Sequence, residues 1–378
     1  MNKIKAILIA AAALATLAIP GAAAPPASGQ YLSYVGTYTR QKSKGIYAYK
    51  FDAKTGKFTS IGLAAETSNP SFLAVHPGGK FLYAVNENNQ GTVSAFAIDR
   101  ATGMLKPLNS VSSKGSGPAH LSVDAAGKWV FVANYNNGSV AALPIHADGS
   151  LGEAAASVQH SGSSVDRPRQ SGPHAHEAVV SRDRKLLFVP DLGMDKVMIY
   201  RIDPVKGALT ANDPASIGIA PGFGPRHLAF APNGNFLYVM AEMADAIVAF
   251  RYDGKGGAKE IQTISAVPAD FTGQKSGAEI AVHPNGKFLY ATNRNHNSIG
   301  IFAIGADGKL TAAGNVSTQG KTPRHFAIDP TGAYLIAENQ DSDNMVVFRI
   351  DAQTGGLTPT GETLDVGAPV SLVFVALQ

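Results

Sequence analysis

One motif recurs six times along this 378-residue chain and constrains its fold more than any other feature. Each copy has a short apolar run, a tight turn and a second run rich in Phe, Leu, Tyr and Val; the copies begin at Asn69, Gly117, Pro173, Gly224, Ser276 and Thr322. Their turn residues are spaced by 48, 57, 50, 52 and 46 residues; they are Gly79, Gly127, Arg184, Gly234, Gly286 and Gly332. A period near 50 residues is typical of units that bury their apolar faces on their neighbours.

Each unit contains two hairpin signals. Turns such as Pro-Gly-Gly and Pro-Asn-Gly supply turn geometry at low steric cost, so the motif predicts a β-hairpin. A second turn-rich motif follows after a short interval and occurs seven times, beginning at Phe51, Ile98, Ile145, Ile202, Tyr252, Ile304 and Ile350. Two hairpins per repeat make four antiparallel strands, which is the content of one propeller blade. No stretch has the periodicity of an amphipathic helix of ordinary length.

The unequal counts of the two hairpins indicate how the ring closes. The mature N-terminus, which starts with Gln30 to Thr39, would supply three strands of a blade, and the terminal run from Ala368 to Val375 its innermost strand. Such closure removes exposed sheet edges. We therefore predict an all-β fold, with a single seven-bladed β-propeller domain of four-stranded antiparallel blades over residues 30–378, closed by the C-terminal strand.

The first residues have the features of an export signal. Lys3 and Lys5 precede an apolar stretch from Ala6 to Ile19, and small residues follow at 21–24. This pattern predicts a signal peptide over residues 1–24, and hence a periplasmic or secreted protein. The stretch is short for a membrane span, so no span is expected in the mature chain; an uncleaved anchor is the alternative. The absence of Cys excludes disulfides and lipid attachment through an N-terminal Cys.

Composition and missing motifs exclude several function classes. Only 16% of residues are charged, while 40 Gly and 22 Pro fit many short strands joined by turns. No cluster of Lys and Arg interleaves with aromatic residues, so no nucleic-acid partner is expected. A Gly-x-Ser-x-Gly elbow is absent, which disfavours a serine hydrolase of that type. The pair His176-Glu177 lacks the second His of a zincin helix.

Alignment of the repeats identifies the residues that break the pattern. Six residues before the turn Pro, or its equivalent, the repeats have Ser71, Ala119, His176, Arg226, Ala278 and Arg324. The next position has Phe72, His120, Glu177, His227, Glu279 and His325. The position at the outgoing end of the second strand has Glu87, Tyr135, Leu192, Glu242, Arg294 and Gln340. The first strand of each blade lines the axis of a propeller, so matched positions converge on one channel mouth. Charged residues there predict a polar ligand site.

Structural roles remain open for several of these residues. His120, His227 and His325 recur at one repeat position, so they fit a hydrogen bond to a neighbouring blade as well as chemistry. Arg226 and Arg324 fit inter-blade ion pairs, and Glu242, in an apolar segment, needs a partner such as Arg226.

Two further histidines, His174 and His176, sit at alternate positions of one strand and share a face. No third metal ligand is apparent for them, which favours a base or hydrogen-bonding role.

With these motifs the chain resembles a known family, the seven-bladed propeller lactonases. The family includes propeller-type bacterial 6-phosphogluconolactonases and the fungal carboxy-muconate lactonising enzyme. The most specific matches are Gly224-Pro-Arg-His227, the following Pro232-Asn-Gly turn, and Pro173-His-Ala-His176 after the polar insertion 162–172. The resemblance runs from Tyr31 to the terminal strand. It implies lactone hydrolysis, with the catalytic positions matched by His176 (or His174), Arg226, Glu242 and Arg294.

These residue types suit the implied reaction. A His near its ordinary pKa could take a proton from water, and Arg could polarise the carbonyl or grip a carboxylate or phosphate. His174, Glu87, His227 and Arg324 are the candidate substrate-binding residues. We expect a monomer whose partner is a small lactone, with no cofactor and no catalytic metal, because two guanidinium groups would repel a divalent ion.

The substrate and the class of activity stay open. A phosphorylated gluconolactone is a cytosolic intermediate, whereas this chain carries an export signal, so an unphosphorylated aldonolactone or another lactone is an alternative. A non-catalytic periplasmic binding propeller and a muconate-type cycloisomerase are the other hypotheses.

Overall fold

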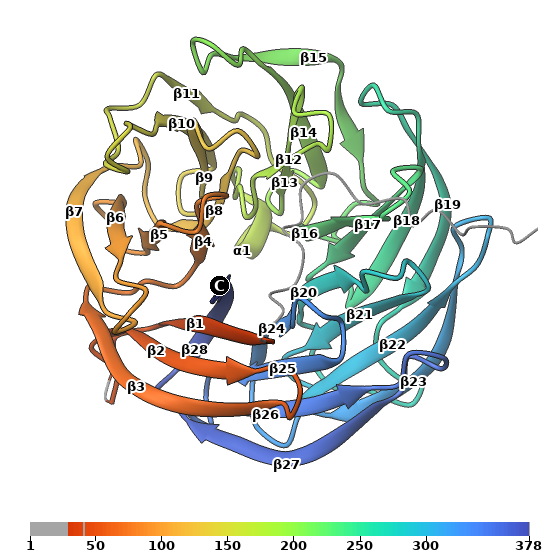
Figure 1. Ribbon diagram of the computed structural model, residues 1–378. Coiled ribbons are helices and arrows are strands. Elements are labelled where there is room, and N and C mark those ends of the chain that lie inside the picture. The colour runs from red at the N-terminus through yellow and green to blue at the C-terminus, as the bar shows by residue number, and fades with distance from the viewer. Residues whose placement is uncertain (1–28, 41, 378) are drawn as a thin grey trace, which may run out of the picture.

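The computed structural model describes residues 29–40 and 42–377, which form a ring of seven β-sheets around a central axis (Figure 1). Each sheet has four antiparallel strands, so the predicted seven-bladed propeller is confirmed. The predicted signal peptide, residues 1–24, lies outside the described residues. Within the described part of the chain, no helix is long and apolar enough to cross a membrane.

The blades are numbered here in chain order, with strands given from the axis outwards. Blade 1 consists of β28 (Pro369–Ala376), β1 (Gln30–Thr37), β2 (Gly45–Asp52) and β3 (Lys57–Glu66). Blade 2 consists of β4 (Leu73–Val75), β5 (Phe81–Asn86), β6 (Thr92–Ile98) and β7 (Leu105–Ser112). Blade 3 consists of β8 (Pro118–Val123), β9 (Trp129–Asn134), β10 (Ser139–Pro144) and β11 (Ala156–Gln159). Blade 4 consists of β12 (Val179–Val180), β13 (Leu186–Asp191), β14 (Lys196–Ile202) and β15 (Leu209–Gly218).

The remaining three blades have the same order. Blade 5 consists of β16 (Pro225–Phe230), β17 (Phe236–Ala241), β18 (Ala246–Tyr252) and β19 (Ala258–Ser265). Blade 6 consists of β20 (Gly277–Val282), β21 (Phe288–Asn293), β22 (Ser298–Ile304) and β23 (Leu310–Ser317). Blade 7 consists of β24 (Pro323–Ile328), β25 (Tyr334–Asn339), β26 (Asn344–Ile350) and β27 (Leu357–Asp365).

The C-terminal strand closes the ring as predicted. β28 pairs with β1 in a register that runs from Tyr31 opposite Ala376 to Thr37 opposite Pro369. The same strand also bonds to blade 2, because the Leu73 amide donates to Ser371 Oγ at 3.1 Å. Blade 1 therefore joins the two ends of the chain.

Packing between blades explains why the ring forms as one unit. Among the residues that the structure describes, seven buried apolar clusters occur, and each is built from two neighbouring blades. Phe131 of blade 3, for example, shares a cluster with Leu187 and Val189 of blade 4. The second strands are buried on both faces, which is why they appear in the sequence as continuous apolar runs. A single blade could not bury both of its faces alone.

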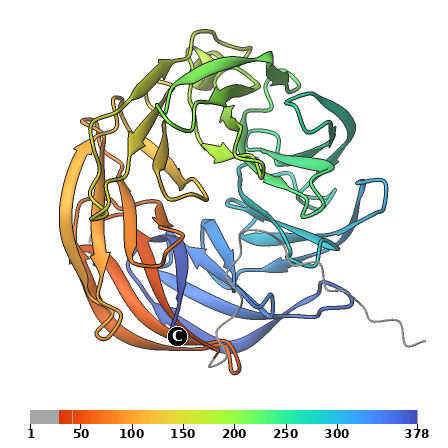
Figure 2. The same ribbon diagram turned by 45° about the horizontal axis from the view of Figure 1, so that its top comes forward.

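A short insertion brings the one helix of the described residues to the axis. α1 (Arg167–Gln170) lies near the centre of the ring in Figure 1, and Figure 2 shows the ring tilted. The side chain of Asp166 caps the helix by accepting from the Arg169 amide. Gln170 is fully buried and donates to the Leu192 carbonyl at 2.8 Å. These bonds hold the insertion against the inner end of blade 4.

Candidate active site

Three guanidinium groups converge on one buried carboxylate at the axis. Glu242 directly follows β17, and its side chain is 6% exposed. Its carboxylate lies 2.8 Å from Nη2 of Arg294, 3.2 Å from Nε of Arg226 and 2.7 Å from Nη2 of Arg169. The partnership of Glu242 with Arg226 was expected from sequence, whereas the contribution of Arg169 was not.

Local backbone irregularities place two of the arginines. The register between β16 and β17 shifts between Pro225 and His227, so Arg226 is the extra residue of a β-bulge. The same shift between β24 and β25 makes Arg324 a bulge residue in blade 7. A bulge redirects a side chain away from the regular alternation of the strand. Both arginines therefore occupy a repeat position that differs geometrically from an ordinary strand position.

The charges in this cluster shape one another. Burial alone would raise the pKa of Glu242, but Arg294, Arg226 and Arg169 together lower it to about 2. Because the folded pKa is below the ordinary value, the ionised carboxylate stabilises the fold at neutral pH, and this contribution is lost as pH falls from about 4.5 towards 2. Burial also lowers the pKa of Arg226, and the like charges of Arg324 and Arg294 lower it further. Positive charge is therefore in excess around Arg226.

His176 and His174 lie beside the arginine cluster through a shared contact with Tyr135. The ring of His174 stacks on Tyr135 at a centroid distance of 4.7 Å, and that of His176 meets Tyr135 edge-on at 5.4 Å. The hydroxyl of Tyr135 accepts from Arg169 at 3.2 Å. The two histidines flank an isolated bridge at Ala175 instead of standing within a longer strand, since β12 begins at Val179.

The two histidines differ in their surroundings. His176 is buried, and burial, followed by the charge of Arg226, holds its pKa well below 6.5. Its Nδ1 and Nη1 of Arg226 are buried without a hydrogen-bond partner among the described residues, whereas Nε of Arg226 faces Glu242. His174 is half-buried, and its Nδ1 lies 2.9 Å from the Tyr135 carbonyl. His176 is thus neutral with an unpartnered ring nitrogen, whereas Nδ1 of His174 is engaged, and the expectation of a His near its ordinary pKa is wrong for His176.

The next residue along the innermost strands is alternately His and Glu in blades 3 to 7, whereas blade 2 has Phe72 there. His227 Nδ1 lies 3.0 Å from Glu279 of the next blade, which confirms the expected inter-blade contact for this histidine. His325 Nε2 lies 3.6 Å from the same carboxylate, and His325 Nδ1 lies 2.9 Å from Glu338. On the other side His120 Nε2 lies 3.7 Å from Glu177. These contacts link blade 3 to blade 4 and blade 6 to blades 5 and 7; a substrate-binding role for His227 stays a prediction.

Glu87 and Arg324 lie together near Tyr38. The Tyr38 hydroxyl donates to Glu87 at 2.8 Å, and the guanidinium of Arg324 lies over the Tyr38 ring at 5.5 Å. Ser71 also bonds to Glu87. Arg324 makes no ion pair within 4 Å among the described residues. Its guanidinium packs on the face of the Tyr38 ring instead. Its guanidinium is not tied to a carboxylate at that distance.

The sequence analysis missed two residues of this site. Arg169 belongs to the insertion that makes the 57-residue spacing the longest of the five, and that spacing was the available signal. Tyr135 occupies the same repeat position as Glu242, but its role depends on Arg169. Within residues 29–40 and 42–377, no group of three or more His, Cys, Asp or Glu is arranged to hold a metal ion.

Comparisons with known proteins agree with this geometry. A family model described as "Lactonase, 7-bladed beta-propeller" matches residues 33–374. The 6-phosphogluconolactonase of Bacillus subtilis strain 168 is 38% identical over 349 residues, covering 92% of this chain and 99% of that protein. The 6-phosphogluconolactonase of Formosa agariphila is 33% identical, covering 90% and 98%. The solved structure of a periplasmic gluconolactonase from Pseudomonas aeruginosa is similar, with 36% identity, a TM-score of 0.88, and coverage of 92% and 100%.

Proposed function

We propose that this chain hydrolyses a sugar-type lactone at the site around Glu242, because it belongs to the seven-bladed β-propeller lactonase family. The observation that carries the proposal is a neutral, buried His176 close enough to Arg226 for its charge to lower the His176 pKa, together with Nη1 of Arg226, which has no hydrogen-bond partner among the described residues. A base and oxyanion donors side by side are the minimum that ester hydrolysis requires.

In the proposed reaction His176 takes a proton from water as the water oxygen attacks the lactone carbonyl carbon. The carbonyl oxygen becomes an oxyanion, which Arg226 and Arg294 stabilise by charge and hydrogen bonds. Collapse of the tetrahedral intermediate breaks the ring C–O bond, and the proton held by His176 passes to the departing alkoxide. The product is the open hydroxy acid.

Glu242 acts in this scheme as a positioning residue. It holds Arg226, Arg294 and Arg169 in one cluster, so its loss would leave three cations without their shared carboxylate. The cations around the site also include Arg324, and the nearby negative charges are the carboxylates of Glu242 and Glu87. This excess of positive charge supports a substrate that carries a phosphate or carboxylate, or one rich in hydroxyl acceptors.

The names of the relatives suggest substrates, and the N-terminal residues suggest a location. The names of the relatives include both 6-phosphogluconolactonase and periplasmic gluconolactonase, so the two gluconolactones are the first candidates. We propose a periplasmic or secreted location from the pattern around Lys3 and Lys5. All seven blades are completed within one chain, so no second copy is needed to close the ring, which supports a monomer.

A lactone panel tests the activity directly. We expect acid release from gluconolactone or its 6-phosphate to exceed the buffer rate in a pH-stat, with the preferred substrate given by the ratio of the two kcat/KM values. No acceleration for either lactone, together with capture of a protein or ligand, would favour the binding propeller. Turnover of carboxy-muconate alone would favour the cycloisomerase.

The pH profile tests His176 as the base. Since burial lowers its pKa, kcat/KM should stay constant as pH falls through about 6.5 and decline only below that value. Unphosphorylated gluconolactone is the suitable substrate, because its own charge does not change in this range. A midpoint at or above about 6.5, after subtraction of the spontaneous rate, would contradict the assignment.

A further inference from the structure

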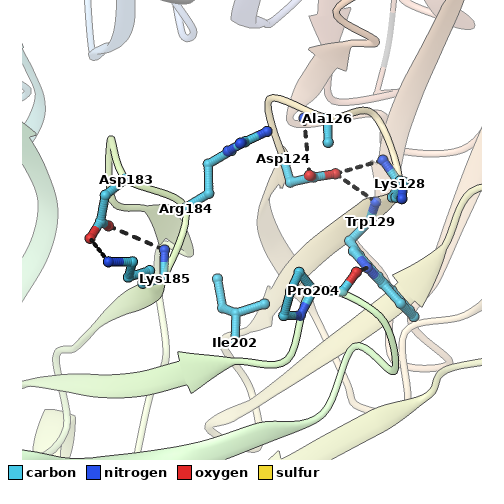
Figure 3. A pocket seen from close by; sticks show the side chains of 9 residues that line it. All are labelled: Asp124, Ala126, Lys128, Trp129, Asp183, Arg184, Lys185, Ile202 and Pro204. Carbon is cyan, nitrogen blue, oxygen red and sulfur yellow. Dashed lines mark hydrogen bonds and ion pairs between the residues drawn. The ribbon is translucent and has the colours of Figure 1, made fainter.

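A second site lies between blades 3 and 4, at the end of the innermost strands opposite Glu242. It is a pocket of about 410 Å³, formed by the first hairpin turns of both blades and by Ile202 and Pro204 beside them (Figure 3). Arg226 stands at the start of β16, whereas Asp124 of this pocket follows the end of β8. A strand of six residues, about 20 Å long, separates the two levels.

A histidine that bridges two other blade interfaces is absent at this one. At two other interfaces a histidine reaches the next turn: His76 Nε2 lies 3.2 Å from the Gly127 carbonyl, and His283 Nε2 lies 2.8 Å from that of Gly332. The same repeat position in blade 3 is Asp124. Its carboxylate accepts from amides of its own turn, at 2.6 Å from Lys128 and 2.8 Å from Trp129. No such bridge therefore crosses from this turn to blade 4.

Arg184 occupies an unusual position beside this gap. Its φ is +63°, a conformation that the other five copies of the turn assign to Gly, with φ between +63° and +76°. An L-residue adopts this region at an energetic cost, and such strain concentrates at functional sites. Figure 3 shows the side chain of Arg184 extending across the pocket towards the turn of Asp124 and Ala126.

The acidic side chains that line the pocket have hydrogen-bond partners, whereas two of the basic side chains have none in the described part of the chain. Both carboxylates are occupied: Asp124 by its own turn, and Asp183 by Ser181 Oγ at 2.6 Å and by the amide and ammonium of Lys185. Arg184 and Lys128 donate no side-chain hydrogen bond and form no ion pair with other described residues. Two cations thus face a pocket whose carboxylates already accept hydrogen bonds from their own turns.

We propose that this pocket binds a small molecule bearing a phosphate or carboxylate group. The planar guanidinium of Arg184 would grip two oxygens of the anion, with Lys128 as a second positive charge. Ile202 and Pro204 offer apolar surface for the rest of the ligand. The site is independent of lactone hydrolysis, because it shares no residue with the Glu242 cluster.

The chain carries its own reporter for this site. Trp129 is the only tryptophan, it lines the pocket, and its Nε1 donates to the Pro204 carbonyl at 3.1 Å. Titration with inorganic phosphate and, separately, with succinate should change Trp129 fluorescence saturably, at an ionic strength held constant with chloride. Arg184→Gly should weaken this affinity at least tenfold. The variant is expected to fold, because five equivalent turns already have Gly there.

Controls separate binding from general charge effects. Arg182→Ala removes an exposed arginine two residues away that does not line this pocket, and should leave the affinity unchanged. Lactone turnover of Arg184→Gly should equal that of the parent. Calorimetry repeats both titrations in case binding leaves fluorescence unaltered. Absence of binding by both methods, or an affinity in Arg184→Gly within twofold of the parent, would overturn the proposal.

Discussion

Replacing Arg226 with Ala is expected to lower lactone turnover by about a hundredfold or more, mainly in kcat. The guanidinium carries a buried donor without a partner, Nη1, and an oxyanion that forms in the transition state gains more from it than the ground-state carbonyl does. Glu242→Gln should cause a loss of similar size for a different reason. The amide keeps the shape of Glu242 but removes the charge that gathers Arg226 and Arg294. Steady-state kinetics on the better gluconolactone measures both effects.

The matched control is Arg251→Ala, which removes an arginine from the same blade. Arg251 lies over the ring of Phe236, at the end of the blade away from Glu242. Lactone turnover of the Arg251→Ala variant should remain within about twofold of the parent, as expected for an exposed position. Thermal unfolding of all three variants shows whether a loss reflects chemistry or folding, since breaking a buried ion pair can itself destabilise. Normal turnover in folded Arg226→Ala and Glu242→Gln would refute the site.

Deletion of residues 368–378 should abolish cooperative folding. β28 contributes Leu372 to the cluster between blades 7 and 1, and Val375 to the cluster between blades 1 and 2. With Val370, which is also buried, three side chains worth about 1.5–3 kcal/mol each are lost, against a typical stability of about 5–15 kcal/mol. The deletion also leaves β1 unpaired at an edge. Circular dichroism during heating and size-exclusion chromatography would show the loss.

The same Val→Asp change at a buried and at an exposed position tests how much the packing of the C-terminal strand contributes to stability. Val375→Asp places a carboxylate in the apolar cluster of blades 1 and 2, where the residue is 2% exposed, and should destabilise by about 3 kcal/mol or more. Val205→Asp makes the same change at a turn where Val205 is 83% exposed, and should have little effect. A truncated protein that unfolds cooperatively near the parental temperature would contradict the closure argument. Restoration by a peptide of residues 368–378 would support it.

The fold could be predicted from the sequence because its information is local and repeated. The turn at Gly79 has the residues that a hairpin needs, as do all its copies except the one with Arg184, and the flanking apolar runs have the length of strands buried on both faces. Six copies of one hairpin and seven of the other leave a single way to complete the last blade. That blade is the one that β28 and β1 form.

The candidate site could be predicted only where it follows the repeat. Glu242 and Arg294 occupy the same repeat position in blades 5 and 6, and Arg226 starts the innermost strand of blade 5, so ring geometry brings the three together. Arg169 has no counterpart in any other blade, because it belongs to an insertion. Its position depends on the burial of Gln170 and on the bond to the Leu192 carbonyl, neither of which has a sequence pattern. Loop placement of this kind is set by tertiary contacts.

The sequence by itself determined the number of blades, the closure of the ring and the level of the axis at which charged residues meet. Only the tertiary structure decided how those residues act on one another. The bulge at Arg226, the three guanidinium groups around Glu242 and the burial that keeps His176 neutral arise when separate blades come within a few ångströms. The physical reason is range: strand and turn preferences act between neighbours in the chain, whereas desolvation and charge pairing depend on neighbours in space.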